Sequence, residues 1–150
     1  MRSPPSICRV FATAALIAAG LPAAAAPALA ADPVAGEWLT PDGGSKVRIA
    51  ACPGKPELMC GVVSWLSAAH AKDLDTRNPD AALRKRPILG VSTLSGFKQA
   101  APGKWAGGKL YDPASGKTYK GKISTDPNGA LKVEGCVLIV CQTQTWKRAG

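Results

Sequence analysis

Residue types that could catalyse a reaction are scarce in this chain of 150 residues, which has a single histidine. His70 is the only base that a nucleophilic triad could use, and it lies far from any G-x-S-x-G turn. The acidic residues are few and mostly stand in turns, which disfavours the paired carboxylates of glycoside hydrolysis. The sequence therefore predicts a protein that is not an enzyme and has no catalytic residue.

Two groups of residues resemble metal ligands, but each lacks a feature that the metal requires. Asp73, Asp75, Asn78 and Asp80 are spaced like part of a calcium loop, yet no glycine turn and no terminal glutamate accompany them. The cysteines lack the C-x-x-C spacing of a structural zinc site. We predict no metal and no cofactor. We expect Asp75 or Asn78 to hydrogen-bond Arg86 instead, as a latch that holds a long loop over one end of the fold.

Residues 1–31 are typical of a signal peptide. A basic start is followed by an apolar stretch from Phe11 to Leu21 and by small residues before the expected cleavage site. The stretch is short for a membrane span, and an uncleaved N-terminal anchor is the alternative. Cleavage leaves one exported domain, residues 32–150, that remains net basic because only Arg2 and Arg9 of the 19 basic residues are removed. We expect no transmembrane segment in this mature chain.

Four cysteines remain after cleavage, and an even number in an exported chain predicts two disulfides. We expect the pairs that are close in sequence, Cys52–Cys60 and Cys136–Cys141, because each pair brackets a predicted loop. The crossed connectivities stay open. Each disulfide is expected to contribute about 2–4 kcal/mol to stability.

Polar and apolar residues alternate along several segments, which is the pattern of strands with one wet and one dry face. In Lys46–Ala51 the basic residues share one face and the aliphatic residues share the other. Turn sequences such as Asp126–Gly129 separate these segments. The predicted strands are 36–40, 45–51, 60–66, 88–95, 104–111, 117–124, 130–137 and 141–148. Eight short strands with tight turns predict an all-β fold, a small up-and-down barrel.

One connection, residues 67–87, is much longer than the others, and long loops in small domains are often functional. Asn78 before Pro79 is a helix-start signal. We therefore expect a short helix through residues 81–85, ending by Arg86 because Pro87 follows.

The last strand suggests an interior with polar side chains. If Trp146 points inward, Gln142 and Gln144 do too, because they share its parity. Amides beside an aromatic ring suit a cavity better than a dry core. The opposite register would place Cys141, Thr143 and Thr145 inside. The residues we predict to line a ligand site are Trp65, Trp105, Tyr119, Gln142 and Gln144.

Val137–Val140 form an apolar run between two cysteines, where a hairpin tip is expected. We expect this run to fold onto the barrel as a lid. The alternative is an exposed contact patch for a lipid or a partner.

Several motifs resemble known proteins. Gly36-x-Trp38 opens the first strand as in lipocalin-like and fatty-acid-binding-like barrels, the calycins, which often place a basic residue of the last strand over that tryptophan. The chain is similar to the family catalogued as domain of unknown function 2147. The further motifs that carry this likeness are Cys60-Gly61, Asp75-x-x-Asn78-Pro79-Asp80, Arg86-Pro87-Ile88-Leu89-Gly90, Tyr111-Asp112-Pro113, Gly116-Lys117-Thr118-Tyr119 and Gly135-Cys136 with Cys141 and Trp146. The resemblance implies an exported, mostly bacterial, calycin-like domain, and it implies no activity.

These observations predict a binding protein of the bacterial periplasm or exterior that takes a small, partly apolar or lipid-like molecule at one barrel mouth. The alternative is a structural or cell-envelope interaction module with a solid core, whose basic outer face attracts anionic surfaces. We do not expect nucleic acid as a partner, because an exported protein seldom meets it and because the lysines alternate along strands as on a solvent face.

Overall fold

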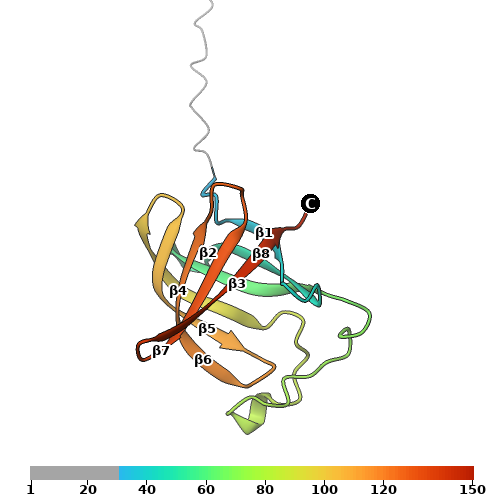
Figure 1. The fold of residues 1–150 in the computed structure, drawn as a ribbon. Helices are drawn as coiled ribbons and strands as arrows, with labels where there is room; N and C mark the ends of the chain where they lie inside the picture. Colours follow the sequence, from blue (N-terminus) through green and yellow to red (C-terminus); the bar gives the residue numbers. More distant parts are fainter. Residues whose placement is uncertain (1–30) are drawn as a thin grey trace, which may run out of the picture.

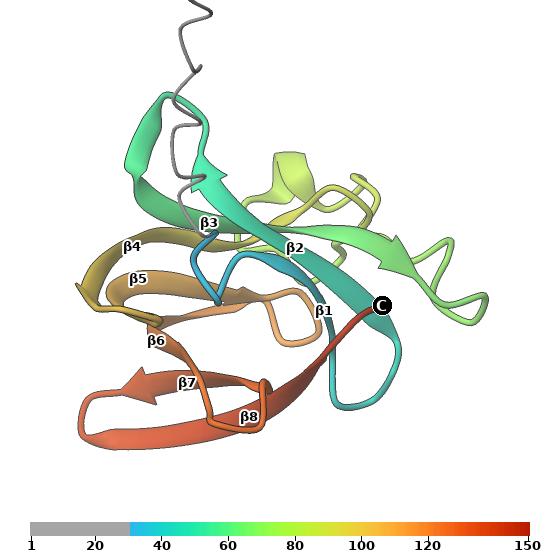
Figure 2. The same cartoon turned by 90° about the horizontal axis from the view of Figure 1, so that it is seen from above.

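Eight antiparallel strands, each paired with the next one in the chain, close into a barrel (Figure 1, Figure 2). The computed structural model describes residues 31–150. Pairing of the first strand with the last, through Trp38 opposite Arg148 and Leu39 opposite Lys147, closes the ring. The strands are β1 (Gly36–Leu39), β2 (Ser45–Cys52), β3 (Lys55–Leu66), β4 (Ser92–Ala101), β5 (Lys104–Asp112), β6 (Lys117–Thr125), β7 (Leu131–Val137) and β8 (Val140–Arg148). The predicted all-β, eight-stranded up-and-down barrel is confirmed.

The predicted signal peptide, residues 1–31, lies outside the described residues except for Ala31. Within residues 31–150, no helix has the length and apolar character needed to cross a bilayer.

Two of the eight strands differ from their predicted ranges by more than one residue. β3 begins at Lys55 rather than at residue 60, and β4 spans Ser92–Ala101 rather than 88–95. The apolar residues 88–91 instead close the long β3–β4 loop, where the Ile88 N–H donates to the Asp73 carbonyl at 2.9 Å. Gly90 has φ +86°, a conformation that interrupts a strand.

The predicted helix is reduced to one 3₁₀ turn, Ala81–Leu83. Its cap is Asp80, whose side chain accepts a hydrogen bond from the Ala82 N–H at 2.9 Å. The prediction that Asn78 is the cap is wrong. The Asn78 side-chain oxygen accepts a hydrogen bond from the Asp80 N–H, which precedes the 3₁₀ turn. None of the residues of this turn is buried, so no packing surface is available to extend it into an α-helix.

Glycines in β5 and β6 make room for the aromatic ring of Phe97 in the middle of the barrel. Gly108 and Gly121 stand opposite each other, and a Cβ at Gly108 would overlap the ring of Phe97. Phe97 is fully buried in the core. This part of the interior is therefore filled by an aromatic side chain packed against backbone.

The junction between β1 and β8 carries the basic residue over tryptophan that the calycin resemblance implies. The Arg148 guanidinium lies 4.2 Å from the ring centroid of Trp38. It also donates to the carbonyls of Pro33 at 2.6 Å and Ala35 at 3.2 Å. The indole N–H of Trp38 donates to the Val34 carbonyl at 2.8 Å, so the N-terminal segment is fixed against this end of the barrel.

Candidate ligand-binding cavity

An up-and-down barrel gathers alternate connections at the same end, and one end here surrounds a cavity of about 1050 Å³. The β3–β4 loop, the β5–β6 turn and the β7–β8 hairpin all lie at the lower end of the barrel in Figure 1. The opening is lined by Asp42, Leu74 and Pro113, each from a different connection at this end, and by Val140 at the start of β8. We call this the open end. A volume of this size suits a small organic molecule.

The walls of the cavity inside the barrel are mainly aliphatic. They come from inward-facing positions on β2, β3, β4, β5 and β7, which alternate with solvent-facing residues as predicted. The aliphatic lining residues of these strands are Val47, Val63, Leu94, Leu110 and Val133. The interior can therefore accept apolar surface.

The last strand adds polar groups to this apolar wall. Gln142 and Gln144 line the cavity together with the buried Trp146, whose indole N–H donates to the Gln144 side-chain oxygen at 2.9 Å. Thr145 lies on the outer face, where it accepts a hydrogen bond from Lys132 at 2.7 Å. The strand thus has the parity that the sequence indicated, and Trp146 fixes the orientation of one of the two amides.

Tyr119 and Thr93 add further polar groups to the lining. Tyr119 is half-buried, lines the cavity as predicted, and packs against the core. Thr93, which sequence reasoning missed, is 9% exposed, and its hydroxyl has no hydrogen-bond partner among residues 31–150. A buried hydroxyl without a partner is costly, so a polar group in the cavity would stabilise this site. No motif in the sequence distinguishes Thr93 from the outward-facing threonines.

Trp65 does not line the cavity, in contrast to the prediction. A β-bulge leaves Ser64 unpaired, because Lys46 stands opposite Trp65 while Val47 stands opposite Val63. The extra residue reverses the alternation. Trp65 therefore points outward, 42% exposed, with the Lys46 ammonium 5.3 Å from its ring centroid, and Leu66 takes the inward position.

Trp105 is buried, but the structure places it at the other end of the barrel. It stands at the start of β5, opposite Gln99, and lines a second cavity of about 480 Å³ beside Pro33 and Pro102. It therefore does not meet Tyr119, Gln142 and Gln144, and the predicted set of five lining residues is reduced to three around the open end.

The predicted latch is present and fixes the long loop. Asp75 is fully buried and accepts hydrogen bonds from Asn78 at 2.7 Å and from Arg86 Nε at 2.9 Å. Arg86 Nη2 lies 2.7 Å from the same carboxylate oxygen. The other oxygen accepts from the Tyr111 hydroxyl of β5 at 2.5 Å, a partner that sequence reasoning missed. Tyr111 joins the loop to the barrel wall and also lines the cavity.

These contacts shift the ionisation of both partners of the short hydrogen bond. Burial alone would raise the pKa of Asp75, but the hydrogen bonds from Tyr111, Asn78 and Arg86 outweigh it, and the pKa is lowered from 3.8. Burial, together with the hydrogen bond to the Asp75 carboxylate, raises the pKa of Tyr111 to about 12. The latch is therefore an ionised carboxylate with a neutral phenol at neutral pH.

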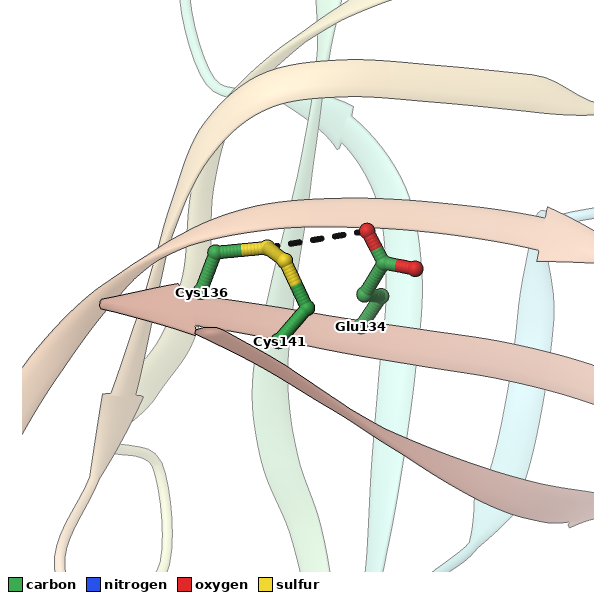
Figure 3. Close-up of side chains that lie close together, drawn as sticks. All are labelled: Glu134, Cys136 and Cys141. Carbon is green, nitrogen blue, oxygen red and sulfur yellow. Dashed lines mark hydrogen bonds between the residues drawn. A yellow bond between two sulfur atoms is a disulfide. The ribbon is translucent and has the colours of Figure 1, made fainter. Parts of the chain in front are cut away.

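Both disulfides have the pairing that is local in sequence, Cys52–Cys60 and Cys136–Cys141. Figure 3 shows Glu134 beside the second one, with its Oε1 3.6 Å from Cys136 Sγ. A disulfide sulfur carries no proton and is not a thiolate, so this group offers a metal only the carboxylate. That carboxylate is already paired with Lys122 at 2.9 Å.

The apolar run 137–140 does not form the predicted lid. Leu138 and Ile139 are each 96% exposed at the hairpin tip, and they project from the barrel instead of covering it. A two-residue connection between paired strands is too short to fold back over the opening. Val137 and Val140, at the base of the tip, line the rim of the cavity.

The closed barrel and its arginine-covered tryptophan define a lipocalin-like fold. A solved structure with this fold is described as "Protein HP1028 from the human pathogen Helicobacter pylori belongs to the lipocalin family". It matches with a TM-score of 0.69 and 24% identity, over 78% of this chain and 83% of that one. The chain belongs to the family DUF2147, "Uncharacterized protein conserved in bacteria", which it matches over residues 36–148. A comparison with curated proteins gives no match.

Proposed function

We propose that this protein is an exported bacterial binding protein that holds one small, partly apolar molecule in the cavity at the open end. The observation that carries the proposal is the combination of aliphatic walls with a small group of polar side chains on one cavity. Ligand sites of small barrels have this composition, in which apolar surface supplies affinity and a few polar groups fix orientation. The alternative with a solid core is disfavoured by the cavity itself.

The positions of the polar groups suggest the chemistry of the ligand. Gln144 is oriented by Trp146, and the Thr93 hydroxyl lacks a partner among the described residues. At the rim, Lys72 and Arg77 are accompanied by Asp73, so the opening does not select strongly for one sign of charge. The proposed ligand has an apolar body that meets the aliphatic walls and a hydroxyl, carbonyl or amide group that meets Thr93 and Gln144.

The proposal assigns no reaction to this site. His70 Nδ1 lies 2.8 Å from Asp73 Oδ2, but about half of each side chain is exposed, so the pair stands in water at the rim. Such a pair lacks the dry surroundings that make acid–base groups effective. Export is supported by the two disulfides, which form in oxidising compartments.

A cavity-filling variant tests the proposal. Gly135 lines the cavity, and a Cβ added there meets Leu110 and Tyr119 at an ordinary 3.5 Å, so Gly135→Leu fills space without backbone strain. Native mass spectrometry of the protein purified from the periplasm is expected to show added mass that the variant loses. Thr143→Leu, on the outer face of β8, is the matched control and is expected to retain it.

Titration with a fatty-acid and small-metabolite panel gives the second readout, because Trp146 borders the cavity and its fluorescence should respond to occupancy. The proposal is abandoned if the native protein carries no added mass and no compound changes the fluorescence. It is equally contradicted if Gly135→Leu and the native protein bind a compound with the same affinity.

A further inference from the structure

The tip of the β7–β8 hairpin, residues 137–140, exposes four consecutive aliphatic side chains. Leu138 and Ile139 are each 96% exposed, and Val137 and Val140 are more than half exposed. A run of this kind on a surface is a feature that folded domains avoid unless the surface binds something. The tip is therefore a candidate interaction surface.

The backbone of the tip is also unusual for these residues. Two-residue hairpin turns favour glycine or asparagine wherever a central residue takes positive φ. Leu138 has φ +54°, and it is the one non-glycine residue with positive φ among residues 31–150. A leucine in this conformation does not favour folding, and its side chain is not buried in the core. Both observations are accounted for if the tip is kept apolar for contact with a partner.

The tip is held rigidly in this position. Cys136 and Cys141 stand directly opposite each other at its base and form the disulfide seen in Figure 3. A cross-link beside a short turn fixes the conformation of the tip in the free protein. Binding to a partner therefore causes little further loss of conformational entropy.

Basic side chains flank the tip on the outer face of the neighbouring strands. Lys120 of β6 stands opposite Cys136, and Lys109 of β5 stands opposite Lys120. Both are exposed, and neither has an ion-pair partner among the described residues, whereas Lys122 is paired with Glu134. Two free ammonium groups therefore lie beside the apolar tip.

We infer that the 137–140 tip inserts into the headgroup region of an anionic lipid bilayer, with Lys109 and Lys120 contacting the lipid phosphates. Aliphatic residues beside lysines are the combination that anchors proteins at such a surface. The tip of four residues is small for a stable protein–protein interface, which buries about 800 Å² on each partner. A lipid surface needs no such area, because the acyl region accepts single side chains.

The location of the tip links docking to the cavity. Val137 and Val140 line the rim, so a docked molecule holds its open end close to the lipid. Exchange of an amphiphile between membrane and cavity, which rests on the proposed function, would follow from this geometry. Docking itself does not depend on that function.

Vesicle co-sedimentation of the purified protein tests the inference. The native protein is expected to bind vesicles of phosphatidylethanolamine and phosphatidylglycerol at low salt, and to bind phosphatidylcholine vesicles much more weakly. The double variant Leu138→Asn/Ile139→Gly removes both exposed aliphatic side chains and places at position 138 a residue that tolerates positive φ, so it is expected to fold about as stably as the native protein and to bind about tenfold more weakly. Val62→Thr removes an exposed aliphatic side chain from the barrel wall and is expected to bind like the native protein.

Charge is tested separately. Lys109→Gln/Lys120→Gln is expected to weaken binding to anionic vesicles, whereas Lys55→Gln/Lys104→Gln, which removes the same charge at the other end of the barrel, is expected to change it little. The inference fails if the native protein binds no vesicle, or if the Asn-Gly variant binds as tightly as the native protein. If that variant alters self-association in sedimentation velocity but not vesicle binding, the tip is an interface between copies and the inference is wrong. The Asn-Gly variant is expected to bind the cavity ligand with unchanged affinity. A loss of vesicle binding in this variant therefore tests membrane docking independently of the proposed ligand binding.

Discussion

The hydroxyl of Tyr111 on β5 donates a 2.5 Å hydrogen bond to the buried carboxylate of Asp75, which lies 36 residues earlier in the β3–β4 loop. This bond joins the loop over the open end to the wall of the barrel. The turn after β5 lies against the same loop, because a Cβ at Gly116 would overlap the Arg77 backbone. The shape of the opening therefore depends on how firmly this loop is held.

Tyr111→Phe is expected to loosen the loop while leaving the barrel folded. Asp75 keeps its contacts with Asn78 and Arg86, so the cost is about 1–2 kcal/mol, near the lower end for a buried group that loses one partner. Hydrogen exchange should accelerate at the amides of Asp75 and Ile88, which bond within the loop. Tyr119→Phe is the matched control, and similar exchange in both variants would contradict the latch.

The latch also predicts how stability changes in alkali. Folding raises the pKa of Tyr111 from 10.0 to about 12, so the neutral phenol is stabilised in the folded state. A raised pKa contributes stability that is complete below pH 10 and declines as the pH rises towards the folded value. The free energy of unfolding of the native protein should therefore fall towards that of Tyr111→Phe between these pH values. A difference that is constant with pH would be inconsistent with the shift.

Acid should weaken the same latch by protonating its other partner, Asp75. The folded pKa of Asp75 lies below 3.8, so the carboxylate contributes stability above that value, and the contribution disappears as the pH falls through the folded pKa. Asp75→Asn should reduce the free energy of unfolding at neutral pH by about 3 kcal/mol, because a buried ion pair loses one partner. In urea unfolding experiments, this difference is expected to shrink in strong acid. An equal difference at both pH values would argue against an ionised Asp75.

The two disulfides are expected to differ in their reactivity towards reductants. Cys52 is buried, whereas Cys141 is exposed, so a mild reductant should open Cys136–Cys141 first. Full reduction should lower the melting temperature by several degrees, since each short loop contributes about 2–3 kcal/mol. Alkylation and mass spectrometry during reduction report the order. Four free thiols in the untreated exported protein would contradict both the pairing and the proposal of export.

The packing of Phe97 against glycine gives a prediction for the core. Gly108→Ala forces a methyl group into the ring and should cost about 1–3 kcal/mol. Gly135→Ala, where a Cβ meets only ordinary contacts, is the control and should cost less. Adding Phe97→Leu to Gly108→Ala should recover part of the loss in thermal unfolding, because the smaller side chain relieves the overlap. Strictly additive effects would show that the two positions do not interact.

Regular alternation is the reason that much of this fold could be predicted. β8 has no bulge in its pairing with β7, so the parity of Trp146 correctly oriented Gln142 and Gln144. The same reasoning failed at Trp65, because one unpaired residue in β3 reverses the faces and nothing in the sequence marks it. Period-two arguments hold only as far as the next bulge.

Other differences have distinct physical origins. Residues 88–91 are apolar enough for a strand, but their hydrogen bonds close the loop to Asp73 and Val63 instead of extending a ladder. The prediction that Trp105 lines the same site as Tyr119 is wrong, although the position of Trp105 just after the β4–β5 turn places it at the opposite end of the barrel. The contact between Asp75 and Tyr111 joins positions far apart in sequence, and only the closed barrel brings them together.

The pairing of Arg148 with Trp38 also constrains the order of events during synthesis. The cation over the indole belongs to Arg148 in the last strand of the barrel, β8, and Trp38 stands in the first strand, β1. Because closure of the barrel needs both β1 and β8, the ring cannot close until β8 has been synthesised, and until then the nascent sheet has an open edge.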